Sequence, residues 1–187
     1  SGHIAGTEVS LTLEELMHFL LEEFVDFQRG AGNGLVSIAG GMNEALLMRA
    51  MKNAGLIEGT DFSKTGKNSE ADLVIHSHAA NHKNLGVEVK SYHARERLLR
   101  GLRDITGLKV GAGYFRDPSE FNTARTKTLL QADPAAIYMP QTTLSQVDPD
   151  ARAMTTNDPI AFQRPLYRPL ETFVSDMAHF AKTGQLP

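Results

Sequence analysis

Three charged residues, Asp72, Glu88 and Lys90, stand at spacings that can support phosphodiester chemistry. Glu88 and Lys90 lie two residues apart in the segment NLGVEVKSY, where valines take the alternating positions. Because side chains alternate along a strand, the acid and the base project from one face and the valines from the other. The pattern predicts an amphipathic strand whose polar face carries a carboxylate next to an ammonium group.

Asp72 begins the preceding apolar segment, 72–77, and the polar residues 78–84 separate it from the second strand. This arrangement predicts a β-hairpin in which Asp72 lies beside Glu88. Two adjacent carboxylates repel each other unless a cation lies between them, and hard oxygen ligands suit Mg²⁺. Lys90, on the same face, can orient or help deprotonate a metal-bound water and stabilise the charge of a phosphorane. Such a site hydrolyses phosphodiesters.

Asp72, fifteen intervening residues and then Glu88-Val89-Lys90 resemble the motif of the PD-(D/E)xK nuclease superfamily. That superfamily includes most type II restriction endonucleases, together with junction resolvases and repair nucleases. The resemblance covers residues 42–105, read as helix, loop, Asp strand, Glu-x-Lys strand and helix. Ala71 stands where many members have a proline before the aspartate.

The resemblance implies a Mg²⁺-dependent enzyme in which Asp72 and Glu88 bind the metal and Lys90 positions the attacking water. It also implies that a glutamate on the preceding helix reaches the metal, and Glu44 is the matching position. Cleavage would leave a 5′-phosphate and a 3′-hydroxyl. Small type II enzymes of this kind act as homodimers on palindromic double-stranded DNA, since a two-fold protein matches a two-fold site.

A structural interpretation of the same residues stays open. Glu88 and Lys90 can form a solvated cross-strand ion pair on a half-exposed sheet, and such pairs contribute only about 0–1 kcal/mol to stability. Glu44 is also favoured by the helix dipole alone, because it lies in the first turn of the predicted helix. However, Lys90 is the one lysine of the eight in the chain with an acidic residue two positions before it.

The basic residues are concentrated in residues 90–127, which hold nine basic and four acidic side chains, whereas the chain as a whole has a net charge of −3. A polyanion is therefore expected to bind one face of the molecule. Within 94–105, arginines recur on the polar side of a predicted amphipathic helix, where they contact DNA or remain a solvated face. Recognition is expected there and in 113–127. The predicted DNA-binding residues are Ser91, His93, Arg95, Arg97, Arg100, Arg103, Arg116 and Arg125.

Two other kinds of site are disfavoured. His76, His78, His82 and His93 suggest zinc, but no recognisable ligand spacing completes a site. The glycine run 30–34 lacks a preceding strand, and Gly66-Lys67 is followed by asparagine, so neither is a phosphate-binding P-loop.

The element order predicts an α/β fold: a single domain, 1–187, with a mixed central β-sheet flanked by α-helices, similar to a restriction endonuclease core. Helices are expected at 13–27, 42–56, 94–105, 122–132 and 169–184, and strands at 72–77, 85–92, 108–115 and 135–140. Residues 61–71 and 141–163 are expected to be irregular, and residues 1–10 to be a tag remnant or flexible.

The chain has no cysteine, which excludes disulfides and thiolate chemistry and favours a reducing, cytoplasmic setting. It shows neither a membrane span nor a signal peptide. The leading hypothesis is a type II restriction endonuclease that acts on double-stranded DNA with Mg²⁺ as cofactor. The alternatives are a structure-selective resolvase or repair nuclease of the same fold, and a non-catalytic DNA- or protein-binding α/β domain.

Overall fold

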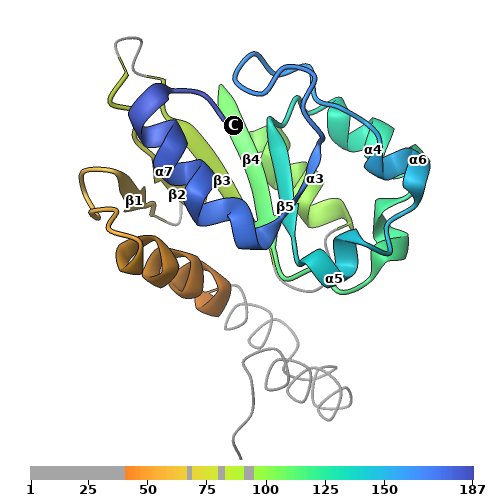
Figure 1. Cartoon of the computed structure of the whole chain (residues 1–187), viewed down its shortest axis with the longest axis horizontal. Helices are drawn as coiled ribbons and strands as arrows, with labels where there is room; N and C mark the ends of the chain where they lie inside the picture. The colour runs from red at the N-terminus through yellow and green to blue at the C-terminus, as the bar shows by residue number, and fades with distance from the viewer. Residues whose placement is uncertain (1–40, 67–68, 80–82, 91–94) are drawn as a thin grey trace, which may run out of the picture. The chain divides into compact units, whose positions relative to one another are not determined.

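A six-stranded sheet forms the centre of the computed structural model, which describes residues 41–66, 69–79, 83–90 and 95–187 (Figure 1). Neighbouring strands follow one another in chain order from β1 to β6. The first three strands are antiparallel, and β3, β4, β5 and β6 are parallel. The strands are β1 (Phe62–Lys64), β2 (Leu73–Ile75), β3 (Leu85–Lys90), β4 (Leu108–Gly113), β5 (Ala136–Met139) and β6 (Tyr167–Pro169).

Helices cover both faces of this sheet. On one face lie α7 (Phe173–Thr183) and a helix over residues 41–53. On the other lie α3 (Arg95–Asp104), α4 (Thr123–Leu130), α5 (Gln141–Leu144) and α6 (Pro149–Arg152). Figure 1 shows α7 crossing in front of the strands and α3 behind them. The described residues therefore form one α/β domain with a mixed sheet and flanking helices, as the sequence predicted.

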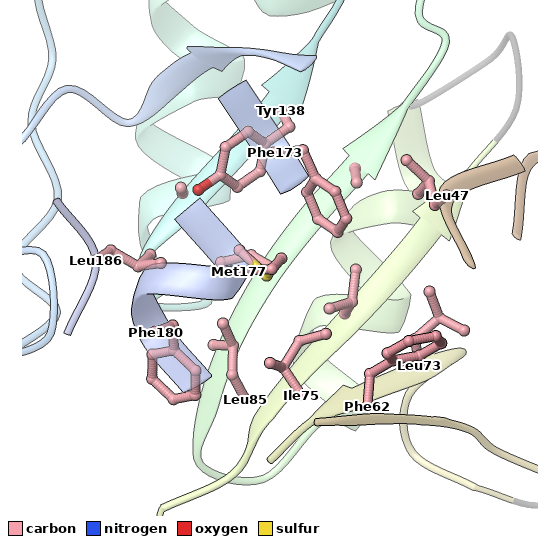
Figure 2. Close-up of a cluster of buried hydrophobic side chains, with 14 of the residues drawn as sticks. Leu47, Phe62, Leu73, Ile75, Leu85, Tyr138, Phe173, Met177, Phe180 and Leu186 are labelled. Atoms are coloured by element: carbon pink, nitrogen blue, oxygen red, sulfur yellow. The ribbon is translucent and has the colours of Figure 1, made fainter. Parts of the chain in front are cut away.

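Each face of the sheet has its own hydrophobic core. On the α7 face, Leu73, Ile75 and Leu85 of the hairpin pack with Met177 and Phe180 (Figure 2). On the α3 face, a second cluster joins leucines of α3 to residues of β5 and of the loops and helices that follow α3, including Leu98, Leu102, Phe115, Phe121 and Ile137. The valines of β3 face the first core, so the polar face of this strand lies under α3.

The hairpin, helix α3, strands β4 and β5 and helix α4 confirm the sequence predictions. Gly55, with a φ of +90°, ends the helix over residues 41–53, and Gly184, with a φ of 71°, caps α7. Glycine suits both positions, because a left-handed conformation at a helix end costs glycine little. The predicted helix 13–27 lies outside the described residues.

Two of the predicted segments were wrong: the irregular segment 61–71 and the start of the last helix. Residues 61–71 contain β1, because fully buried Phe62 pairs with Ile75. The last helix begins at Phe173, because Pro169 pairs with Met139 as part of edge strand β6, where a proline is tolerated.

The segment 141–163 also contains more order than expected. It includes the short helices α5 and α6. The dipeptide Asp148-Pro149 starts α6, because the aspartate carboxylate accepts the N–H groups of Asp150 and Ala151 and proline suits the first helical position.

Candidate active site

Pairing of β2 with β3 brings Asp72 beside Glu88. Leu73 is the Cα partner of Val87. In this antiparallel pair, Asp72, which directly precedes β2, therefore lies opposite Glu88 of β3. The N–H of Asp72 donates to the carbonyl of Val87 (3.1 Å), and its Oδ2 accepts the N–H of Val89 (2.7 Å). Asp72 is therefore fixed to the neighbouring strand through both backbone and side chain, as the hairpin predicted.

The Lys90 ammonium lies among three oxygen atoms of this hairpin. Its Nζ donates to Asp72 Oδ2 and to the Val89 carbonyl, both at 3.2 Å, and it forms an ion pair with Glu88 Oε1. Two carboxylate oxygens and one carbonyl oxygen thus converge on a single cationic group. Hard oxygens of these kinds are the ligands that Mg²⁺ takes in proteins, so the donor set fits that ion.

The three side chains differ in their access to solvent. Glu88 is only 5% exposed, whereas the side chains of Lys90 and Asp72 are 23% and 28% exposed. Glu88 forms the floor of the cluster, and the other two form its solvent-facing side. The open interpretation of a solvated pair on a half-exposed sheet is therefore wrong for Glu88, because α3 covers this face.

Burial has a marked effect on the two charged groups of β3. Burial first, and then the nearby charges of Asp72 and Asp104, raise the pKa of Glu88 to about 7 against the opposing effect of Lys90. Burial also acts to lower the pKa of Lys90, but the adjacent Glu88 and Asp72 outweigh it, so this pKa is raised. At neutral pH the cluster thus holds a firmly cationic lysine beside a glutamate that is close to its titration midpoint.

Glu44 lies on the helix over residues 41–53, where its carboxylate forms an ion pair with Lys64 of β1 (2.8 Å). Among the described residues, no group of three or more His, Asp or Glu side chains is arranged to hold a metal ion. The donors that converge are therefore the carboxylates of Asp72 and Glu88 and the Val89 carbonyl. The role of Glu44 as a third acidic ligand stays a prediction.

Two residues near the site were not predicted from the sequence. Asn43 is 1% exposed, its Nδ2 lies 3.5 Å from the Lys90 carbonyl oxygen, and its Oδ1 has no partner in the described part of the chain. Gly101 of α3 lies directly against the Glu88 carboxylate. Asn43 carries no sequence signal. Gly101 does carry a signal: glycine destabilises the interior of an amphipathic helix, so its presence there indicates close packing against a neighbouring residue.

The histidines that suggested zinc are engaged separately. His76 Nε2 lies 2.8 Å from Ser63 Oγ, and His78 Nε2 lies 2.7 Å from Asp61 Oδ1. His82 and His93 lie outside the described residues.

The predicted DNA-binding residues fall into three groups. Arg97, Arg100 and Arg103 are exposed on α3, opposite its buried leucines. Arg116 and Arg125 are half-buried, and Arg125 donates to the carbonyl of Ser119 (3.2 Å). The structure does not describe Ser91, His93 or the side chain of Arg95.

Comparisons with protein-family models, curated proteins and solved structures find no match for this chain. Among the described residues, no helix is both long enough and apolar enough to cross a bilayer.

Proposed function

We propose that the protein is a Mg²⁺-dependent endonuclease that hydrolyses phosphodiester bonds in double-stranded DNA, in the manner of a type II restriction enzyme. One observation carries the proposal: Asp72 Oδ2, Glu88 Oε1 and the Val89 carbonyl converge on the Lys90 ammonium at the end of a hairpin. The helix over residues 41–53 is followed by β1, by Asp72 at the start of β2, by the Glu-x-Lys strand and by the Arg-rich helix, and apart from the additional strand β1 this order supports the resemblance to PD-(D/E)xK nucleases.

The energetics of the pair also support a functional role. A structural ion pair gains little when one partner must be buried, because the desolvation penalty offsets the Coulombic attraction. Burial here raises the pKa of Glu88 to about 7 despite the adjacent lysine. Strongly perturbed carboxyl groups beside a specific charged partner are concentrated at functional sites.

The residues of the site can be given distinct tasks. Asp72, Glu88 and the Val89 carbonyl would hold the metal, and a bound Mg²⁺ supplies Lewis-acid polarisation and a more acidic water. Lys90 would donate hydrogen bonds to the attacking water and to the charge that develops on the phosphorane oxygens. One water adds across the P–O3′ bond: its oxygen joins phosphorus and a proton ends on the 3′ oxygen. The products are a 5′-phosphate and a 3′-hydroxyl.

Substrate binding is assigned to the exposed arginines that follow the site in the chain. Arg97, Arg100 and Arg103 lie three residues apart, so they form one row along α3 about 9 Å long. Arginine forks bind phosphates and guanine edges in a bidentate way. A homodimer that places two such sites on a palindrome completes the proposal.

The proposal is tested by incubating the protein with unmethylated phage DNA, with Mg²⁺ or with EDTA, and separating the products on a gel. Discrete Mg²⁺-dependent fragments are expected, and they should disappear in Lys90→Ala. Lys52→Ala is a matched control, since it removes an exposed lysine that pairs with Glu58 on the surface.

Other results have definite meanings. A Mg²⁺-dependent smear, or cleavage of branched DNA alone, would favour a structure-selective resolvase or repair nuclease. DNA that stays intact in several methylation states, and that is nevertheless bound, would favour a non-catalytic binding domain. Full cleavage by Lys90→Ala would remove this lysine from the mechanism.

A further inference from the structure

Gly101 lies in the middle of α3 and packs directly on the Glu88 carboxylate. A Cβ atom at this position would lie 2.7 Å from Glu88 Cγ and would overlap Cδ and Oε1 still more severely. Glycine inside a helix is destabilising relative to alanine. The backbone of Gly101 lies outside the left-handed region, so space, and not conformation, calls for glycine here.

The atom nearest to this missing Cβ is Glu88 Oε1, the same oxygen that pairs with Lys90. We propose that Gly101 is a positioning residue: its bare backbone lets α3 close over Glu88 and holds Oε1 toward Asp72 and Lys90. A side chain at 101 would push the carboxylate away from the point where the site oxygens converge. The inference rests on the proposed function in so far as Glu88 is taken as a metal ligand.

The neighbouring strands supply an internal comparison. Gly86 of β3 and Gly111 of β4 also face α3, and a Cβ at either would lie 2.8 Å from a side-chain carbon of Ile105 or Leu98. Glycines therefore allow a close approach of α3 along this part of the sheet. Of these three glycines, only Gly101 would place its added Cβ against a carboxylate of the site, that of Glu88. Gly111 is the Cα partner of Glu88 on β4, but the atoms nearest to its added Cβ belong to Leu98 and Ile137, so Gly111→Ala perturbs the same helix–sheet contact mainly through apolar side chains.

The first measurement is a thermal unfolding cycle in EDTA. Gly101→Ala is expected to lower Tm by roughly 5 °C, since overpacking of this kind is destabilising. In a Glu88→Ala background the same change should leave Tm unchanged or raise it, because the clash is gone and alanine favours the helix. Gly111→Ala should lower Tm in both backgrounds. Gly41→Ala should do so in neither, because no atom of the described residues lies within 4 Å of its added Cβ.

The second measurement is Mg²⁺ binding by calorimetry, at a temperature where every variant is folded. Gly101→Ala should weaken binding by about 10–100-fold, as is typical when a residue that orients a ligand is changed. Gly111→Ala should stay close to the wild-type affinity. A merely structural role for Gly101 would leave the affinity unchanged.

Two results would overturn the inference. One is an equal loss of Tm from Gly101→Ala with and without Glu88. The other is an equal loss of Mg²⁺ affinity in Gly101→Ala and Gly111→Ala, which would indicate a general displacement of α3. If the wild-type protein binds no Mg²⁺, the proposed function fails, whereas the unfolding cycle still decides whether Gly101 holds Glu88 in place.

Discussion

The Lys90 ammonium lies 3.2 Å from Asp72 Oδ2, and the same carboxylate oxygen accepts the N–H of Val89 at 2.7 Å. One oxygen atom thus fixes the strand that carries the Glu-x-Lys sequence and also contacts the cation of that sequence. Because the ammonium contacts the oxygens that would bind the proposed metal, the lysine and a divalent ion would compete for the same ligands.

This competition predicts opposite effects of Lys90→Met on metal binding and on catalysis. Removing the ammonium leaves Asp72 and Glu88 without their cation, so Mg²⁺ should bind at least about tenfold more tightly, since a unit charge at 4 Å is worth several kcal/mol in a partly buried site. DNA cleavage should be lost at the same time. Calorimetric titration with Mg²⁺ and a cleavage assay on the same preparation check the two effects.

Lys52→Met is the control for this experiment, because its ion pair with Glu58 lies elsewhere on the surface. Its Mg²⁺ affinity and cleavage rate should match the wild-type values. Weaker Mg²⁺ binding by Lys90→Met would show that the ammonium supports the metal site and does not compete with it.

The two tasks of Asp72 can be separated by two substitutions. Asp72→Asn keeps an oxygen that can accept the Val89 N–H, so stability in EDTA should change by less than about 1 kcal/mol. Asp72→Ala leaves a donor without its partner and should cost about 1–3 kcal/mol. Both variants should lose the increase in Tm that the proposed metal site predicts for the wild-type protein in Mg²⁺. Chemical unfolding and thermal shift measure the two effects.

Asp61→Asn provides the comparison, because Asp61 also accepts a backbone N–H at 2.7 Å, from Ile57, but lies outside the cluster. It should keep the full Mg²⁺ response. An undiminished Mg²⁺ shift in Asp72→Asn would instead place the metal at another site.

The sequence predicted the geometry of the hairpin because its signals are local. Alternation with a period of two placed Glu88 and Lys90 on one face, and the hairpin register followed from two adjacent segments joined by a polar loop. The apolar spacing of residues 94–105 likewise predicted α3 and its exposed arginines. In these elements, what each residue contacts is largely decided within about twenty residues of chain.

Other features depend on contacts between distant parts of the chain. Strand β1 lies in a mostly polar segment and β6 ends in a proline, so only their pairing with β2 and β5 defines them. The burial of Glu88 requires α3 to lie over it, which no pattern within β3 encodes. The convergence of the Val89 carbonyl on the site is equally hidden, because a backbone oxygen has no sequence signature.

The raised pKa of Glu88 predicts how stability changes with pH when no metal is present. Since its pKa is about 7 in the folded protein and 4.5 ordinarily, the folded state binds more protons between these values than the unfolded state. The free energy of unfolding should therefore fall as pH rises from about 4.5 to 7, by up to about 3 kcal/mol. Urea unfolding in EDTA at several pH values measures this slope.

Glu88→Gln removes the titrating group with little change of shape, so the part of the slope that belongs to this residue should vanish. The variant should also be more stable than the wild-type protein at pH 8 in EDTA. Identical pH profiles for the two proteins would mean that Glu88 titrates at an ordinary carboxyl pKa.

The arginine row of α3 predicts a salt-dependent loss of DNA binding. Replacing Arg97, Arg100 and Arg103 by alanine should weaken binding to all sequences and reduce the slope of log K against log salt by about 0.9 for each phosphate that the variant no longer neutralises. Stability should change little, because all three side chains are exposed. Fluorescence anisotropy in Ca²⁺ at several salt concentrations measures the slope.

A triple replacement of Arg49, Arg152 and Arg164, which are also exposed, gives the same loss of net charge outside α3. It should leave most of the affinity intact. If both triple variants lose affinity equally, the effect is one of net charge, and α3 is then a solvated face that does not contact DNA. A loss confined to a few sequences would instead assign the row to base recognition, because binding to phosphates carries no sequence information.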